Sequence, residues 1–83
     1  MGIFQTLKHV MTGKVIQQVD TSANAGWTTM SLRLKRQNES DDPYVVLAIV
    51  ATGNKQYVAF ENSEFEEFAE AVATINRSLR QIP

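Results

Sequence analysis

Hydrophobic residues recur at steps of three and four in the last third of the chain, which is the spacing of one face of a helix. The residues on this face are Phe65, Phe68, Val72, Ile75 and Leu79. Ser63 and Glu66 have the Ser-x-x-Glu spacing of a capping box, which places the start of the helix next to Ser63. The pattern therefore predicts an amphipathic C-terminal helix that buries one side against another part of the protein.

A similar spacing occurs at the beginning of the chain, in Gly2–Thr12. The apolar residues of this segment fall on one side of a helix, and Gly13 follows as a C-terminal stop. We therefore predict an N-terminal helix over Gly2–Thr12, although a strand also fits part of the segment.

The sequence between the two predicted helices is rich in residues that favour strands, and it alternates between apolar and polar positions. The predicted strands are Lys14–Asp20, Trp27–Arg36, Tyr44–Thr52 and Lys55–Glu61. Tyr44–Thr52 is almost continuously apolar, which is typical of a central strand buried on both faces. Short polar turns separate the segments, so neighbouring strands are expected to pair antiparallel in chain order, as a meander.

These elements predict an α+β fold for a single domain over residues 1–83. It consists of an N-terminal helix, a four-stranded antiparallel meander and a C-terminal helix packed on the sheet. The sheet face beneath that helix is formed by Met30, Leu32, Leu34, Val58 and Phe60. In this arrangement Phe68→Ala or Val72→Asp is expected to unfold so small a domain. The other face of Tyr44–Thr52 is also apolar, and either the N-terminal helix or a second subunit covers it; we expect a homodimer.

Composition narrows the class of protein. Cysteine is absent, which excludes a disulfide framework, a thiolate metal site and a cysteine nucleophile. Neither a signal peptide nor a membrane span is predicted, so we expect a cytoplasmic, intracellular protein with no membrane partner. Eight basic and nine acidic residues give a net charge of −1, which argues against a strongly electropositive nucleic-acid-binding protein but allows a local basic face.

Residues with catalytic potential are few. His9 is the only histidine, and no nucleophile or carboxylate lies at a diagnostic spacing from it. Glu39, Asp41 and Asp42 lie in one turn, where they fit a solvated surface better than a cation site. The sequence therefore predicts no enzyme, no bound metal and no cofactor.

The outward side of the second predicted strand offers a different chemistry. Aromatic and basic side chains share this side or lie next to it: Trp27, Arg33, Lys35, Arg36, Lys55 and Tyr57. Single-stranded nucleic acid binds such surfaces, because bases stack on aromatic rings and cations follow the phosphate backbone. The same pattern also fits an ordinary half-exposed strand, or a protein interface that contains Trp27.

The last predicted strand and helix resemble those of the transcriptional-coactivator and Whirly-like single-stranded-DNA-binding domains. The residues that carry the resemblance are Lys55, Val58, Phe60, Phe65, Phe68, Val72 and Ile75. The resemblance implies four antiparallel strands followed by a helix, a dimer, and binding of single strands on a curved sheet, with Lys55 at a basic position of the family. The chain differs from the family in its near-neutral charge and in Asn62, where a proline often begins the helix.

Two hypotheses about function follow. The first is a dimeric, non-catalytic module that binds single-stranded DNA or RNA through the six aromatic and basic residues named above. The second is a small protein–protein interaction or assembly module that uses the same face, or the helix stripe, and binds no nucleic acid. Salt distinguishes them, because nucleic-acid affinity falls steeply with added salt and a largely apolar interface is insensitive to it.

Overall fold

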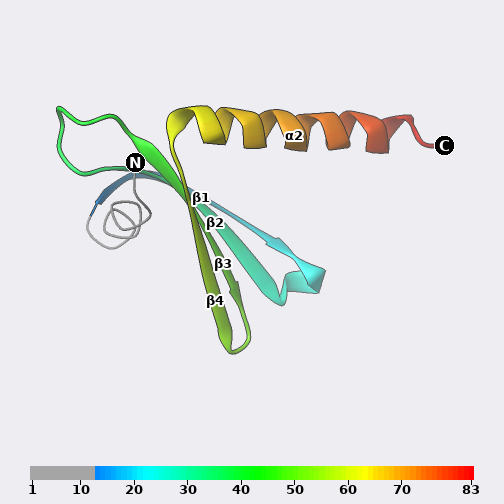
Figure 1. The fold of residues 1–83 in the computed structure, drawn as a ribbon. Coiled ribbons are helices and arrows are strands. Elements are labelled where there is room, and N and C mark those ends of the chain that lie inside the picture. The colour runs from blue at the N-terminus through cyan, green and yellow to red at the C-terminus, as the bar shows by residue number, and fades with distance from the viewer. Residues whose placement is uncertain (1–12) are drawn as a thin grey trace.

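The computed structural model describes residues 13–83, which form one antiparallel sheet followed by one long helix (Figure 1). The elements are β1 (Lys14–Ala23), β2 (Thr28–Arg36), β3 (Tyr44–Ala51), β4 (Asn54–Phe60) and α2 (Asn62–Gln81). The strand order β1-β2-β3-β4 follows the chain, so the predicted α+β fold with a four-stranded meander is confirmed. The N-terminal helix predicted over Gly2–Thr12 lies outside the described residues.

The first strand is longer than predicted. Thr21 and Ser22, which are typical turn residues, instead extend the ladder by pairing with Met30 and Thr29. The connection to β2 is a single 3-10 turn, Asn24–Gly26, whose three residues all have φ between 55° and 89°. Cross-strand pairing thus overrides the turn preference of Thr21 and Ser22. The chain instead reverses its direction at Asn24–Gly26, whose backbone angles lie in the left-handed region.

Pairing across the strands defines the two faces of the sheet, because directly opposed residues lie on the same side. One row joins Ser31, Ala48 and Tyr57, and the next joins Leu32, Leu47 and Val58. The first row belongs to what we call the basic face, which also carries Arg33, Lys35 and Lys55. The second belongs to the apolar face, which also carries Met30, Leu34 and Phe60.

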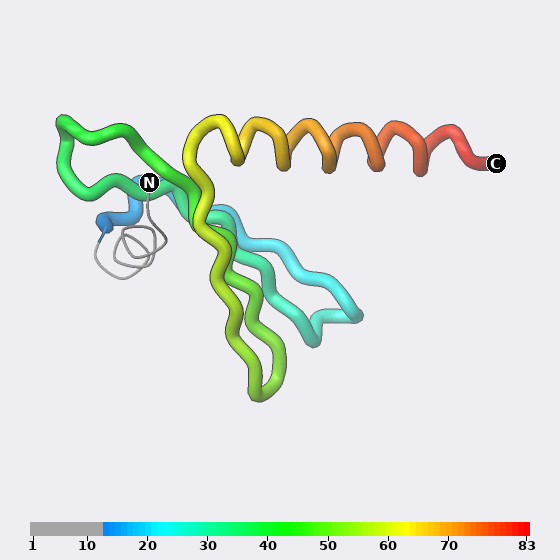
Figure 2. Tube along the Cα trace, in the orientation of Figure 1, coloured from blue at the N-terminus to red at the C-terminus, as the bar shows by residue number. Residues whose placement is uncertain are grey.

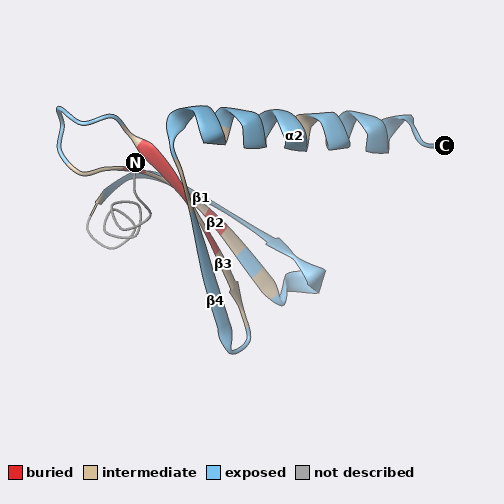
Figure 3. Ribbon diagram, viewed as in Figure 1, coloured by how far each residue is buried: buried red, intermediate tan, exposed pale blue. Residues whose placement is uncertain are grey.

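The most buried side chains lie on the middle strands, as predicted for Tyr44–Thr52. Val46 and Ala48 of β3 are almost fully buried on the basic face, and Val45 is buried on the apolar face. By contrast, every residue of β1 is exposed, and so is most of β4. The core is therefore concentrated at the centre of the sheet, and the two edge strands contribute little to it (Figure 3).

The helix begins earlier than the capping pattern predicted. Glu61 precedes the first helical residue, and its backbone N–H donates to Oε1 of Glu64 at 2.9 Å. The N–H of Phe65 donates to the carbonyl oxygen of Glu61 at the same distance. The prediction that Ser63 and Glu66 form the cap is therefore wrong. The chain turns into the helix directly after β4, so Ser63 already lies within its first turn.

One aromatic cluster joins the helix to the sheet. The ring of Phe60 at the end of β4 stacks on Phe68 with centroids 5.1 Å apart and meets Phe65 edge-on at 5.7 Å. We call these three residues the aromatic junction. It confirms that α2 contacts the face that carries Phe60, through its first two turns.

Beyond the aromatic junction the helix departs from the predicted packing. It extends away from the strands instead of lying along them (Figures 1 and 2). Val72, Ile75 and Leu79 are 53%, 69% and 66% exposed, so they do not cover the apolar face. The radius of gyration, 14.5 Å, exceeds the roughly 12 Å of a compact domain of this length. The connection explains the direction, since Glu61 alone, in an extended conformation, separates β4 from α2.

Candidate nucleic-acid interface

The strand register places three of the six predicted binding residues on an accessible part of the basic face. Arg33 lies on β2, while Lys55 and Tyr57 lie two residues apart on β4, at the other side of β3. Tyr57 is 49% exposed and Arg33 is partly buried. Ala48 and Ser31 lie between Tyr57 and Asp20 in one row across the sheet, and Arg33 lies in the next row, beside Val46.

The hydrogen bonds around Arg33 hold a carboxylate beside it. Its Nε donates to Oγ of Ser31 at 3.3 Å, and Asp20 of β1 lies directly opposite Ser31. Nε2 of Gln18 donates to the Asp20 carboxylate at 3.0 Å. Hydrogen bonding from Ser31, then from Gln18, holds the pKa of Asp20 below its usual value; burial opposes this, and the charge of Arg33 adds the smallest lowering effect. Asp20 therefore stays ionised and offsets part of the positive charge.

The other three predicted residues are placed differently. Lys35 shares the basic face but is only 5% exposed, and burial, with a smaller effect of Arg33, lowers the pKa of its ammonium group. Arg36 alternates to the apolar face, where it pairs with Lys14 across the strands. Trp27 is 70% exposed and lies just before β2 with helical backbone angles, so the strand alternation does not fix its side.

Charge is segregated between the elements of this chain. The strands carry five cations, Lys14, Arg33, Lys35, Arg36 and Lys55, against the single carboxylate of Asp20, which gives them a net charge of +4. The other eight carboxylates lie in the β2–β3 loop, at Glu61 and in α2. The chain is therefore acidic in total while its sheet is basic. Lys14 and Asp20 contribute to this distribution although neither is among the six predicted binding residues; both fall in the first predicted strand.

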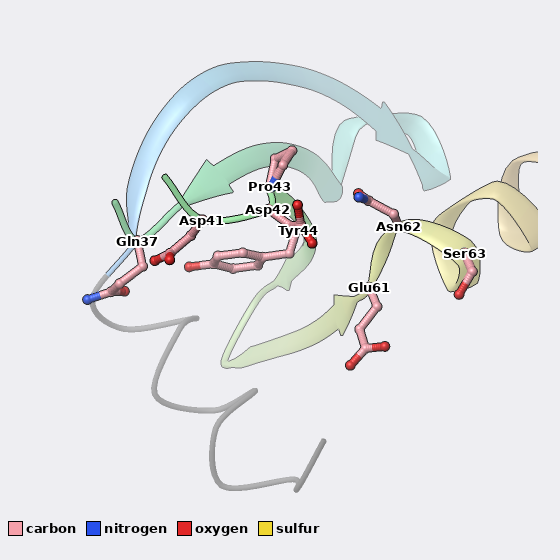
Figure 4. Close-up of a pocket in the computed structure, with 8 residues that line it drawn as sticks. All are labelled: Gln37, Asp41, Asp42, Pro43, Tyr44, Glu61, Asn62 and Ser63. Atoms are coloured by element: carbon pink, nitrogen blue, oxygen red, sulfur yellow. The ribbon is translucent and has the colours of Figure 1, made fainter. Parts of the chain in front are cut away.

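A hollow lies between the β2–β3 loop and the start of α2 (Figure 4). It has a volume of about 580 Å³ and is lined in part by Asp41, Asp42, Tyr44 and Glu61. Oδ2 of Asp41 accepts a hydrogen bond from the Asn38 amide at 3.2 Å. Within residues 13–83 no three histidine or carboxylate side chains converge in a way that could hold a metal ion.

Two further findings concern the chain as a whole. In the described part of the chain, no helix is long and apolar enough to cross a membrane. Comparisons with models of protein families, with curated proteins and with solved structures give no significant match. The resemblance of the last strand and helix to single-stranded-DNA-binding domains therefore stays a prediction.

Proposed function

We propose that this protein is a non-catalytic module that binds single-stranded DNA or RNA on the basic face of its sheet, in the cytoplasm. The observation that carries the proposal is the segregation of charge: a sheet with net charge +4 belongs to a chain of net charge −1, and the basic face carries Arg33, Lys35 and Lys55 against Asp20 alone. Positive potential at such a surface attracts the phosphate backbone regardless of sequence. The exposed rings of Trp27 and Tyr57 supply the stacking that single strands use.

The residues of the basic face have different roles in the proposed binding. Arg33 and Lys55 lie on strands on either side of β3, in different rows, and are suited to contact two separate phosphates of one bound strand. Tyr57 lies between their rows on β4 and offers one ring face to a base, which contributes roughly 1–3 kcal/mol per stacked base. Lys35 acts through the local potential and not by direct contact, because its side chain is buried.

A fluorescence titration tests the proposal, because Trp27 is the only tryptophan. Oligothymidine added at low salt is expected to quench Trp27 emission. Two phosphate contacts per chain predict an affinity about sevenfold weaker at about 200 mM than at about 50 mM salt. Arg33→Gln and Lys55→Gln are each expected to weaken binding and flatten this dependence.

Arg80→Gln is the matched control, because it removes the same charge from the last turn of α2. It should leave the affinity and its salt dependence nearly unchanged. Unaltered Trp27 fluorescence in the presence of single strands, or equal losses for all three variants, would contradict binding at the basic face.

A protein–protein interaction or assembly module is the second candidate. It is favoured by the amount of apolar surface left open on β1 and α2, where Val15, Ile16 and Val19 are about half exposed and Ile75 is 69% exposed. Such a module would show no affinity for oligonucleotides at low salt, and its association with a partner would persist as salt is added.

A further inference from the structure

The apolar stripe of α2 continues beyond the part of the helix that the sheet can reach. Its residues follow one another at alternating steps of three and four, and the last lies just past the end of the helix: Phe65, Phe68, Val72, Ile75, Leu79 and Ile82. From Phe68 to Ile82 their exposed fractions rise from 36% to 70%. Within residues 13–83, the sheet covers this stripe at its start, where Phe60 packs on Phe65 and Phe68. An unbroken 3,4 spacing of this kind is the signature of a seam between two helices.

We propose that the partner of this stripe is α2 of a second copy of the chain, in antiparallel orientation. This inference goes beyond the proposed function, since it concerns the helix and holds whether or not the basic face binds nucleic acid. Three features of α2 support it: the symmetry of its apolar residues, the distribution of its charges and the size of the residues beside the stripe.

The apolar residues of the stripe pair with one another when two copies of the helix run antiparallel. When two copies run antiparallel about a midpoint between residues 73 and 74, Val72 lies opposite Ile75 of the partner subunit. Phe68 then lies opposite Leu79 of the partner subunit, and Phe65 opposite Ile82 of the partner subunit. One register therefore pairs all six apolar residues, each larger ring with an aliphatic side chain, as the alternating layers of an antiparallel seam require.

The charges of α2 favour the antiparallel orientation. Glu64, Glu66, Glu67 and Glu70 lie in its first half, and Arg77 and Arg80 lie in its second half. Glu70 and Arg77 form an ion pair within the chain at 3.4 Å, on the side of the helix away from the stripe, so the contribution across the seam is the general attraction between the acidic half of one helix and the basic half of the other. A parallel pair would instead align four carboxylates with four carboxylates and the two helix dipoles with each other, which is unfavourable.

Small residues border the stripe along most of its length. Ala69, Ala71, Asn76 and Ser78 occupy the flanking positions, where long charged side chains are common in other helix pairs. Their size allows the helix axes to approach closely, because the distance between packed helices depends on the side chains at the contact. The dimer would also bring Leu79 and Ile82 of the partner subunit beside the aromatic junction.

Sedimentation of the full chain at micromolar concentration tests the association. The unaltered protein is expected to be a dimer, and Ile75→Glu is expected to be a monomer, because it places a charge in the central layer. Thr74→Glu is the matched control on the neighbouring outer side of the helix, and it should remain dimeric. Ile75 is 69% exposed within the chain, so circular dichroism should show both variants folded. A monomeric unaltered protein, or a dimeric Ile75→Glu, would overturn the proposal.

Spin labels test the orientation, and the absence of cysteine makes labelling site-specific. In the antiparallel dimer, Ala69 and Asn76 of the partner subunit border the same side of the seam and lie about 3 Å apart along the helix axes. Mixing labelled Ala69→Cys with labelled Asn76→Cys should therefore produce a short distance between the two kinds of label. In a parallel pair the two positions lie on opposite sides of the seam and about 10 Å apart along the axes, so the absence of a short distance in a dimeric mixture would overturn the antiparallel arrangement.

Discussion

At the scale of single residues, Asp20 is the side chain that most reduces the positive charge of the basic face. It is the only carboxylate on the strands, and it lies in the row of Ser31 beside Arg33. Asp20→Asn removes the opposing charge while keeping the shape of the side chain. We expect it to tighten oligonucleotide binding about two- to fivefold, as measured by the Trp27 titration.

The control for this prediction removes an equal charge elsewhere. Glu67→Gln lies on α2, away from the strands, and is expected to change the affinity much less. Equal effects of the two substitutions would mean that only the net charge of the molecule matters, and not the position of Asp20.

Lys35 carries a prediction about pH. Burial lowers the pKa of its ammonium group from 10.5, so between the lowered pKa and 10.5 the unfolded chain holds more protons than the folded one. Stability from this group therefore rises with pH across that window. The free energy of unfolding of the unaltered protein should increase, relative to Lys35→Met, as pH is raised toward 10.5 in urea titrations. A constant difference between the two proteins would argue that Lys35 titrates alike in both states.

Sequence alternation predicted the side of the sheet for these residues but not their exposure. Arg33, Lys35 and Tyr57 share a face, as alternation requires. Whether each is accessible depends on neighbours from other strands, and Lys35 lies opposite Tyr44 at the most buried part of β3. That information is absent from the local pattern around a single strand.

At the scale of elements, the start of α2 depends on one side chain. Oε1 of Glu64 accepts from the backbone of Glu61, whereas Ser63 makes no such contact in the described structure. Glu64→Ala should lower the free energy of unfolding by about 0.5–1 kcal/mol, and therefore the melting temperature by about 2–8 °C. Ser63→Ala should have almost no effect. If Ser63→Ala lowered the melting temperature more than Glu64→Ala does, Ser63 would be the capping residue, as predicted from the sequence.

The elements themselves were more predictable than their packing. Short turns fixed the strand order, and the 3,4 spacing fixed the apolar side of the helix. The spacing indicates that the apolar side of the helix packs against something, but it does not indicate whether that is the sheet or another chain. The structure leaves Val72 53% exposed, so Val72→Asp is now expected to leave the sheet folded and to disturb association instead.

At the scale of the whole molecule, the proposed association through α2 would link stability to concentration. Anything that binds only the folded chain raises its apparent stability by mass action, and here the ligand is a second copy. The melting temperature of the unaltered protein should therefore rise with protein concentration. That of Ile75→Glu should stay constant. A concentration-independent transition in both proteins would show that the folded chain does not depend on a partner.

The aromatic junction also makes α2 a lever arm. The helix is 20 residues long, about 30 Å, and it contacts the sheet only near one end. A tilt of about 10° at Phe60 moves the far end by about 5 Å. Small changes in the packing of three rings thus become large displacements at Ile82. In a pair of such molecules, the shape of these rings sets how far apart the two sheets are held.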